Sequence, residues 1–334
     1  MLACQPRCAG VLERAPPGPL VSVLTGLLLL GGGIALVLWG AERFTDGAVR
    51  VAVRFGLSTF YVGAIVSGFE PENLVTGAAA ALGALPQVAL GTVIGSATFM
   101  LTGGLGLTLL LVRMRVEIPR AGPFAMLVIT VVFAWAIWTG GVVGRWEGAV
   151  LVVVAVGLMI WLCRRSPVFQ RTEEEPGGSA GRISTGRALG GLVIGTSVLV
   201  VGAELVVAGV RMLVSSAQLS ETFLGIVVVG MGESLEETAR MVTPARRGHP
   251  ELAWGNVVGT LVILLGFNLG VIALMRPLAA DPFVLRFHTP YLIVCAGVVV
   301  LALLGRRQVG RGFGLGLFAL FACYLAVNLV NMWR

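Results

Sequence analysis

Ten apolar stretches of about 20 residues run along this chain, and each is long enough to cross the hydrocarbon core of a bilayer. Hydrophobic residues make up 57% of the chain, charged residues make up 12%, and the mean hydropathy is +0.93. A backbone in lipid must satisfy its own hydrogen bonds, which favours helices. The sequence therefore predicts an all-α integral membrane protein. The predicted spans are approximately 19–40, 59–82, 87–111, 122–141, 146–163, 188–210, 222–242, 251–275, 284–304 and 312–332.

The arginines are distributed unevenly among the connections between these spans. The chain has no lysine, so arginine supplies all 24 basic residues. Seventeen arginines fall in odd-numbered connections, and seven fall in even-numbered connections and at the termini. Basic residues accumulate on the cytoplasmic side of a membrane. We therefore expect a protein of the plasma membrane with both termini outside the cytoplasm. Topology and lipid headgroups account for the net charge of +7, and no nucleic-acid partner is expected.

Short motifs recur between the two halves of the chain. Gly40-Ala41-Glu42 returns as Gly202-Ala203-Glu204, and Gly91-Thr92-Val93-Ile94-Gly95-Ser96 returns as Gly255-Asn256-Val257-Val258-Gly259-Thr260. With five spans per half, the second copy must enter the membrane from the opposite face. The sequence thus predicts about ten transmembrane helices arranged as two inverted five-helix repeats. Its expected parts are an external segment at 1–18, a first repeat at 19–163, a cytoplasmic loop at 164–187 and a second repeat at 188–334.

Two glutamate-bearing segments occupy the second span of each repeat, at Gly68–Asn73 and Gly232–Glu237. A charge placed at the middle of a membrane costs about 2.5 to 3.5 kcal/mol on insertion scales, so such groups face a cavity, a partner or an ion. Pro71 and the neighbouring glycines weaken helical hydrogen bonding at these points. Interrupted helices at the interface of inverted repeats form the midplane sites of many transporters. The two segments together predict one cation site.

The chemistry of this predicted site is that of oxygen ligands. Glu233, Glu236 and Glu237 are spaced i, i+3, i+4 and are expected to share a helix face, whereas Glu72 is expected to point away from the face of Glu70 and Asn73. Hydroxyl groups in the third and eighth spans add further oxygens. Hard divalent cations such as calcium prefer this ligand type, and no organic cofactor is expected. The candidate ligands are Glu70, Glu72, Asn73, Ser96, Glu233, Ser234, Glu236, Glu237 and Thr260.

Structural roles for the same residues remain open. Arg240 lies four residues after Glu236 and three after Glu237, so either carboxylate can serve a helix ion pair instead of an ion. Glu233 can also be structural. The two histidines, His249 and His288, are expected at the surface near helix ends.

These motifs resemble those of the calcium/cation antiporter superfamily. Its sodium/calcium exchangers carry Gly-Thr-Ser-Leu-Pro-Glu followed by Gly-Asn-x-x-Gly-Ser, which is similar to the segments that begin here at Gly232 and Gly255. The resemblance implies export of calcium or another cation against sodium or protons by alternating access. It also gives Glu237 the place of an essential ion-binding glutamate. In the first repeat that place falls on Asn73 when counted from Gly91, or on Glu72 when the Pro-Glu pair is matched.

Several positions depart from the family pattern. Phe69-Glu70 and Glu233-Ser234 replace its Thr-Ser pairs, and Met100 and Leu264 stand where exchangers tend to carry Asn or Asp. Sodium ligands are therefore partly missing. Clustered carboxylates in a low dielectric hold protons readily, which makes protons a candidate counter-ion beside sodium. The alternatives are a cation-binding protein that does not transport and an intramembrane enzyme. For the enzyme, neither His-Glu-x-x-His nor Gly-x-Ser-x-Gly occurs.

Overall fold

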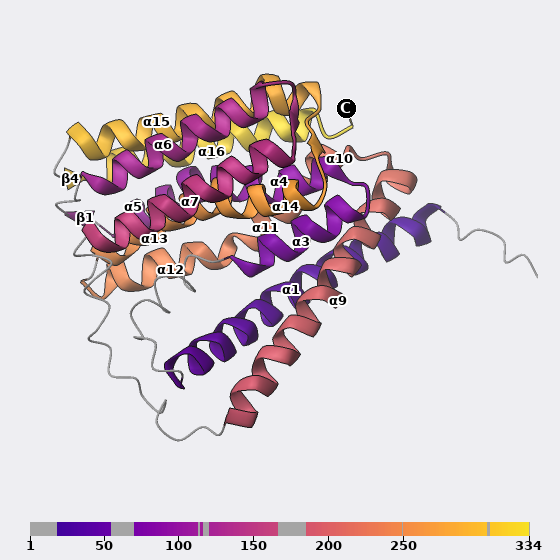
Figure 1. Cartoon of the computed structure of the whole chain (residues 1–334). Helices are drawn as coiled ribbons and strands as arrows, with labels where there is room; N and C mark the ends of the chain where they lie inside the picture. Colours follow the sequence, from indigo (N-terminus) through magenta and orange to yellow (C-terminus); the bar gives the residue numbers. More distant parts are fainter. Residues whose placement is uncertain are drawn as a thin grey trace, which may run out of the picture.

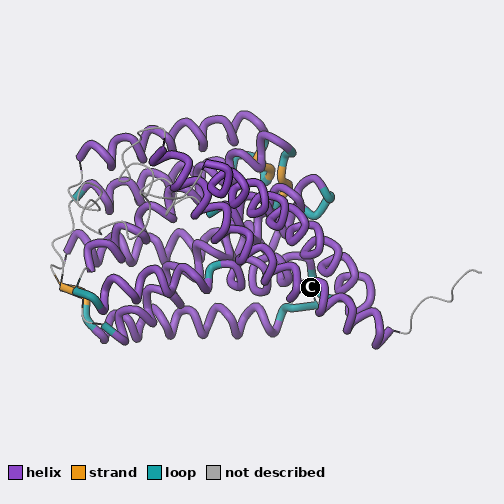
Figure 2. The backbone as a smooth tube through the Cα atoms, turned by 90° about the horizontal axis from the view of Figure 1, so that it is seen from below, coloured by secondary structure: helices purple, strands orange, loops and turns teal. Residues whose placement is uncertain are grey.

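The structure of the chain, a computed structural model, describes residues 19–54, 70–112, 114–115, 120–165, 185–248, 250–305 and 308–333, and it is almost entirely helical (Figures 1 and 2). In the first half the elements are α1 (Pro19–Arg54), α3 (Pro71–Leu82), α4 (Pro86–Phe99), η1 (Met100–Gly104), α5 (Leu105–Leu111), β1 (Met114–Arg115), α6 (Ala121–Trp138), β2 (Val142–Val143) and α7 (Arg145–Arg165). In the second half they are α9 (Thr185–Ala217), α10 (Glu221–Phe223), η4 (Leu224–Gly230), α11 (Met231–Glu233), α12 (Leu235–Arg246), α13 (Pro250–Val262), η5 (Ile263–Asn268), α14 (Leu269–Met275), β3 (Leu278–Ala279), η6 (Val284–His288), α15 (Thr289–Gly305), β4 (Gln308–Val309) and α16 (Arg311–Val330). The η segments are π-helical turns that continue the helices on either side.

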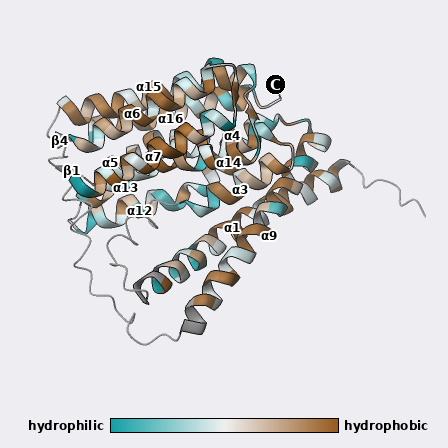
Figure 3. Cartoon of the chain, viewed as in Figure 1, coloured by the Kyte–Doolittle hydropathy of each residue, from teal (hydrophilic) through white to brown (hydrophobic). Residues whose placement is uncertain are grey.

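Eight of the described helices are long and apolar enough to cross a membrane, which confirms the predicted class. Many of their exposed residues are large and apolar. Hydrophilic residues gather at helix ends and along α12 (Figure 3). The other two predicted spans, 59–82 and 222–242, contain the glutamates. The first is described only from Glu70 onward, and the second is interrupted at Ser234. The eight helices are Leu20–Ala48, Pro86–Leu111, Ala121–Trp138, Arg145–Arg165, Leu189–Ala217, Pro250–Met275, Val284–Gly305 and Arg311–Val330.

The first and sixth spans are much longer than predicted, because α1 continues to Arg54 and α9 extends over 33 residues. The two helices pack against each other along their length and are set at an angle to the main bundle (Figure 1). Glycines at intervals of seven residues let the two backbones touch: a Cβ on Gly33 would lie 2.7 Å from the nitrogen of Val206. Glu42, Arg43, Asp46, Arg50 and Arg211 in these extensions are exposed, so hydropathy alone placed the helix ends too early. The contact glycines are Gly26, Gly33, Gly40, Gly47, Gly195, Gly202 and Gly209.

Reciprocal contacts relate the two halves of the bundle. β1 pairs antiparallel with β4, and β2 pairs antiparallel with β3, so each strand of one half meets a strand of the other. The helices follow the same rule: α7 packs on α14, where Gly148 meets Gly270, and α16 packs on α5, where Gly314 meets Gly106. Such exchanged contacts are those expected of two inverted copies that enclose a shared centre.

Two arginines from even-numbered connections have a structural role. The side chain of Arg276 donates to the carbonyl oxygen of Leu82 at 3.0 Å, and Arg211 donates to that of Gly83. Both therefore satisfy carbonyl groups left free at the C-terminal end of α3, where positive charge is also favourable. These contacts explain two of the arginines that do not follow the charge asymmetry.

The centre of the bundle is a backbone crossing between α4 and η4. A Cβ on Gly95 would overlap the carbonyl oxygen of Ile226, and one on Gly230 would lie 2.5 Å from the carbonyl oxygen of Gly91. The crossing thus requires glycine on both elements, and it brings the third span of one half against the seventh span of the other.

We expect Gly95→Val to lower the thermal stability of the detergent-solubilised protein by about 2 kcal/mol or more, because the added side chain must push η4 away from α4. The matched control is Gly157→Val, since a Cβ at Gly157 meets no atom within 4 Å. Thermal unfolding of the two variants measures the difference. Equal stability of both variants would contradict a tight crossing.

Candidate cation site

The helix of the seventh span is interrupted at Ser234, as its sequence predicts. Ser234 has φ −84° and ψ 1°, which ends α11 and starts α12. The carbonyl oxygen of Gly230 accepts from the Ser234 hydroxyl at 3.0 Å and faces the Ser96 hydroxyl at 2.7 Å. These side chains help to compensate the lost regularity of the helix. The break also separates Glu233 from Glu236 and Glu237, so the single helix face expected for the three glutamates is not formed.

The second span is also non-helical at Glu70, its first described residue. Glu70 has φ −91° and ψ 83°, and Pro71 begins α3 at a position that needs no amide proton. Gly68 and Phe69 of the predicted motif lie outside the described residues. Asn268, from η5, donates to the backbone oxygen of Glu70 at 3.2 Å and fixes the break against the other half of the molecule.

The internal register identifies the equivalent residues of the two repeats. The Ser96 hydroxyl lies 2.7 Å from Asn73 Oδ1, and the Thr260 hydroxyl lies 3.5 Å from Glu237 Oε2. Both pairs span 23 residues of sequence. Asn73 is therefore the structural counterpart of Glu237, which corresponds to the first of the two alignments left open by the sequence. Asn73 in turn donates to Glu70 Oε2 at 2.6 Å, so the carboxylate of the first repeat lies one turn earlier.

Glu237 is surrounded by partners from the protein itself. Arg240 donates to its Oε1 at 2.5 Å, and Asn256 donates to its Oε2 at 2.6 Å. Arg240 also donates to Glu236 Oε1 at 2.6 Å, and that side chain is 32% exposed. The ion pair considered as an alternative role for Glu236 and Glu237 is thus present for both residues.

The other buried glutamates have few partners or none. Glu72 and Glu233 are 1% and 0% exposed, and none of their four carboxylate oxygens has a hydrogen-bond partner among the described residues. Glu70 Oε1 is also unpartnered. The described residues thus include four buried carboxylates, those of Glu70, Glu72, Glu233 and Glu237, and of these Arg240 forms an ion pair with Glu237.

The donor set suits a hard cation and not a pre-assembled soft-metal centre. Carboxylate, hydroxyl and amide groups of Glu70 and of α3, α4, α12 and α13 are linked by hydrogen bonds in this region. Within the described ranges, no three His, Cys, Asp or Glu side chains are grouped so that they could hold a metal ion by themselves. An ion held here would take its remaining ligands from hydroxyl groups, backbone carbonyls and water.

Three residues that the sequence did not single out also belong to this region. Asn256 and Asn268 donate to Glu237 and to the backbone of Glu70, and Thr76 is fully buried with an unpartnered hydroxyl. Asn256 was visible as the Asn of the Gly-Asn motif. Asn268 has no polar counterpart in the first repeat, where Gly104 occupies the equivalent position, so no repeat pattern indicated it.

The surface placement expected for His288 is wrong. His288 is 0% exposed, and its Nδ1 lies 2.7 Å from the hydroxyl of Tyr324 within a group of aromatic rings. The ring lies in the π-turn η6, which directs it inward from a helix that hydropathy alone placed near the outer surface. His249 lies outside the described residues.

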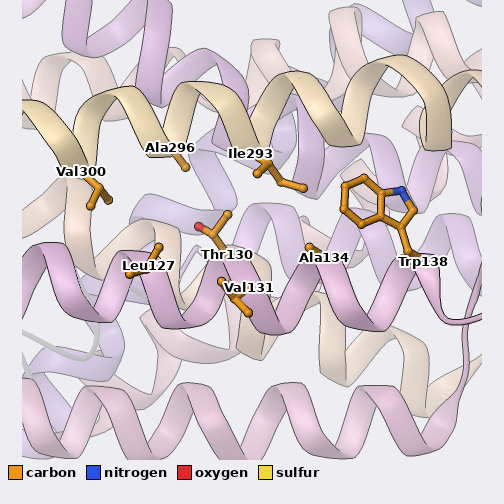
Figure 4. A pocket seen from close by; sticks show the side chains of 9 residues that line it. Leu127, Thr130, Val131, Ala134, Trp138, Ile293, Ala296 and Val300 are labelled. Carbon is orange, nitrogen blue, oxygen red and sulfur yellow. The ribbon is translucent and has the colours of Figure 1, made fainter.

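An apolar groove of about 200 Å³ lies between α6 and α15, away from the carboxylates (Figure 4). Its lining includes Leu127, Trp138 and Ile293, and the hydroxyl of its one polar residue, Thr130, is already donated to Met126. The groove therefore offers no ligand to an ion.

Comparisons with known proteins agree with this geometry. The sequence profile of the family described as "Sodium/calcium exchanger protein" matches residues 25–164 and 187–330. The chain belongs to this family of membrane cation antiporters. The predicted fold, all-α with about ten transmembrane helices in two inverted five-helix repeats, is confirmed.

Among individual proteins, the chain is similar to Inner membrane protein YrbG of Escherichia coli, with 28% identity over 91% of this chain and 96% of that protein. The Putative antiporter CaxA of Alkalimonas amylolytica is 25% identical over 75% of this chain and 80% of its own length. A solved structure of the sodium-calcium exchanger NCX_Mj, soaked with Na⁺ and Sr²⁺, matches with a TM-score of 0.62 at 24% identity and covers 91% of this chain and 98% of that one.

We expect Asn256→Leu to destabilise the protein by about 1.5 to 3 kcal/mol, since Glu237 loses a hydrogen bond to a charged acceptor in a buried setting. Thermal unfolding in detergent measures this loss. Asn331→Leu, after the C-terminal end of α16, is the control and should have a much smaller effect, because its side chain donates only to a nearby backbone oxygen. A loss no larger than that of the control would show that the Asn256 bond is unimportant.

Proposed function

We propose that the protein is a secondary-active antiporter that exports calcium or a similar divalent cation in exchange for protons or sodium. The observation that carries this proposal is the group of four buried carboxylates in segments 70–72 and 233–237, of which only Glu237 is paired with an arginine. The proposed mechanism is alternating access of the two repeats around a midplane site, and the inverted-repeat fold supports it. The repeats are proposed to comprise residues 19–163 and 188–334, joined by a cytoplasmic loop at 164–187.

The proposed ligands combine both repeats. Glu70, Glu72, Asn73 and Ser96 contribute from the first, and Glu233, Ser234, Glu236, Glu237 and Thr260 contribute from the second. Carboxylates supply the charge that a divalent ion needs, and hydroxyl and amide groups complete a hard-oxygen shell. The serine and threonine hydroxyls, which touch Asn73 and Glu237, also hold these side chains toward the centre.

The charge balance supports coupling to a second ion. Four buried carboxylates and one guanidinium leave three negative charges when all groups are ionised, and uncompensated charges in the membrane interior are costly. A divalent cation balances two of them. The third requires a monovalent ion, for which a proton and sodium are the two candidates.

The arrangement of the arginines supports an orientation with both termini outside the cytoplasm, in the plasma membrane. β1 and β4, next to arginine-rich connections, lie at one end of the bundle, and the C-terminus lies at the other (Figure 1). The segment 1–18 is then external.

Proteoliposomes test the proposal directly. Wild-type protein is expected to take up radioactive calcium under an imposed sodium or proton gradient, and Glu237→Gln is expected to lose that uptake, because the arginine beside it is then unbalanced. Glu204→Gln, on the exposed face of α9, is the matched control. Absence of uptake under both gradients would exclude calcium antiport and direct the test to magnesium and manganese.

The two counter-ions give different dependences on pH. Because the hydroxyl positions of the sodium-exchanger motifs are partly lost, we expect calcium uptake to be driven by a pH gradient in the absence of sodium. The measurement is uptake with pH and sodium gradients imposed separately. Exchange that requires sodium and does not respond to pH would overturn proton coupling while leaving antiport intact.

A cation-binding protein without transport is the second candidate. It is favoured by Met100 and Leu264, which are buried apolar residues in the π-turns η1 and η5 beside the site. Calcium-dependent thermal stabilisation together with the absence of flux for every tested cation would establish it.

A further inference from the structure

The glutamate that matches the family motif is not the one available to an ion. Glu237 already has Arg240, Asn256 and the Thr260 hydroxyl around it. Glu72 and Glu233 stand at positions where the motif has no carboxylate, and all four of their oxygens lack hydrogen-bond partners. An unpaired carboxylate in the membrane interior requires a cation or a proton. Glu72 and Glu233 therefore require a cation more strongly than Glu237 does.

Glu72, Glu233 and Thr76 form one group. Glu72 and Thr76 lie one turn apart on the same buried face of α3. The Thr76 hydroxyl lies within interaction range of the Glu233 carboxylate, and Glu72 acts on Glu233 electrostatically. The Thr76 side chain is 0% exposed, and its hydroxyl makes no hydrogen bond of regular geometry among the described residues. Two buried carboxylates and one buried hydroxyl thus lie near one another, and Ile34 of α1 lies against the adjacent Gly232.

The two repeats differ at the position of Arg240, and this difference explains why Glu72 and Glu233, and not Glu237, require a cation. Counting from the pair Asn73 and Glu237, Thr76 is the counterpart of Arg240. In the second repeat, Arg240 places a permanent positive charge beside Glu237. In the first repeat, Thr76 places a neutral hydroxyl beside Glu72 and Glu233. Arg240 also lies within electrostatic reach of Glu72, but its ion pairs in the described part of the chain are with Glu236 and Glu237.

We infer that Arg240 acts as a built-in cation for Glu237 and that a hard divalent cation binds instead at a subsite formed by Glu72, Glu233 and Thr76. The inference rests on the proposed function, which identifies the bound cation as the transported ion. Two carboxylates match the charge of a divalent ion, and the Thr76 hydroxyl adds a neutral oxygen ligand. The Glu237–Arg240 pair lies within α12 and contributes no net charge.

Equilibrium binding of radioactive calcium to the purified full chain in detergent tests the subsite without any transport step. Glu233→Gln removes one of the two subsite charges and is expected to weaken calcium binding about tenfold or more, and Thr76→Val is expected to weaken it by a smaller factor. The double variant Glu237→Gln/Arg240→Gln removes an ion pair without a change of net charge, so it is expected to weaken binding by a smaller factor than Glu233→Gln does. The single variant Glu237→Gln should bind weakly, because its unpaired arginine repels the ion. Glu204→Gln is the control for loss of a glutamate at a distance.

The outcomes separate the two proposals. Loss of binding in the double variant, with binding retained in Glu233→Gln, places the ion at Glu237 and overturns the subsite. Thermal unfolding of each variant shows whether it is folded, and Thr76→Val, which keeps the shape of the side chain, replaces Glu233→Gln if that protein unfolds. Absence of calcium, magnesium and manganese binding to wild type also overturns the subsite. If calcium binding follows the expected pattern but proteoliposomes show no calcium flux, the subsite is supported and antiport is contradicted.

Discussion

Carboxylate groups enclosed by membrane-spanning helices must each find a positive charge, a hydrogen-bond donor or a proton, and this requirement organises the centre of the molecule. Glu237 satisfies it with Arg240 and Asn256, and Glu70 satisfies it in part with Asn73. Glu72 and Glu233 do not satisfy it within the described residues. The protein therefore combines one compensated and one uncompensated pair of carboxylates inside the same bundle.

The backbone makes this arrangement possible. Glycines at the crossing of α4 and η4 bring two halves of the chain into direct contact, and this contact places Ser96 beside Gly230, just before the break at Ser234. A larger residue at the crossing would separate Ser96 from the segment that leads to the break at Ser234. The π-turns η1 and η5 continue the two central helices at equivalent places, so both copies deviate from regular α-helix next to the site.

The two repeats share a fold but differ in chemistry. Asn73 stands opposite Glu237, and Thr76 stands opposite Arg240, so the charged pair of one repeat is a neutral pair in the other. Glu70 and Glu72, together with Glu233, restore negative charge at positions that the family motif leaves uncharged. The candidate cation site is consequently asymmetric.

Much of this protein was determined by sequence pattern alone. Hydropathy, arginine distribution and recurring motifs sufficed for an all-α membrane protein with inverted repeats, because spans, loop charges and glycine contacts are local or periodic features. The lengths of α1 and α9 did not follow, since charged residues on one exposed face end a hydropathy window without ending a helix. The partners of the glutamates also did not follow. Whether Glu237 meets an ion or Arg240, and whether His288 faces outward or Tyr324, depends on rotation about helix axes and on π-turns, and only the packing of distant segments fixes these.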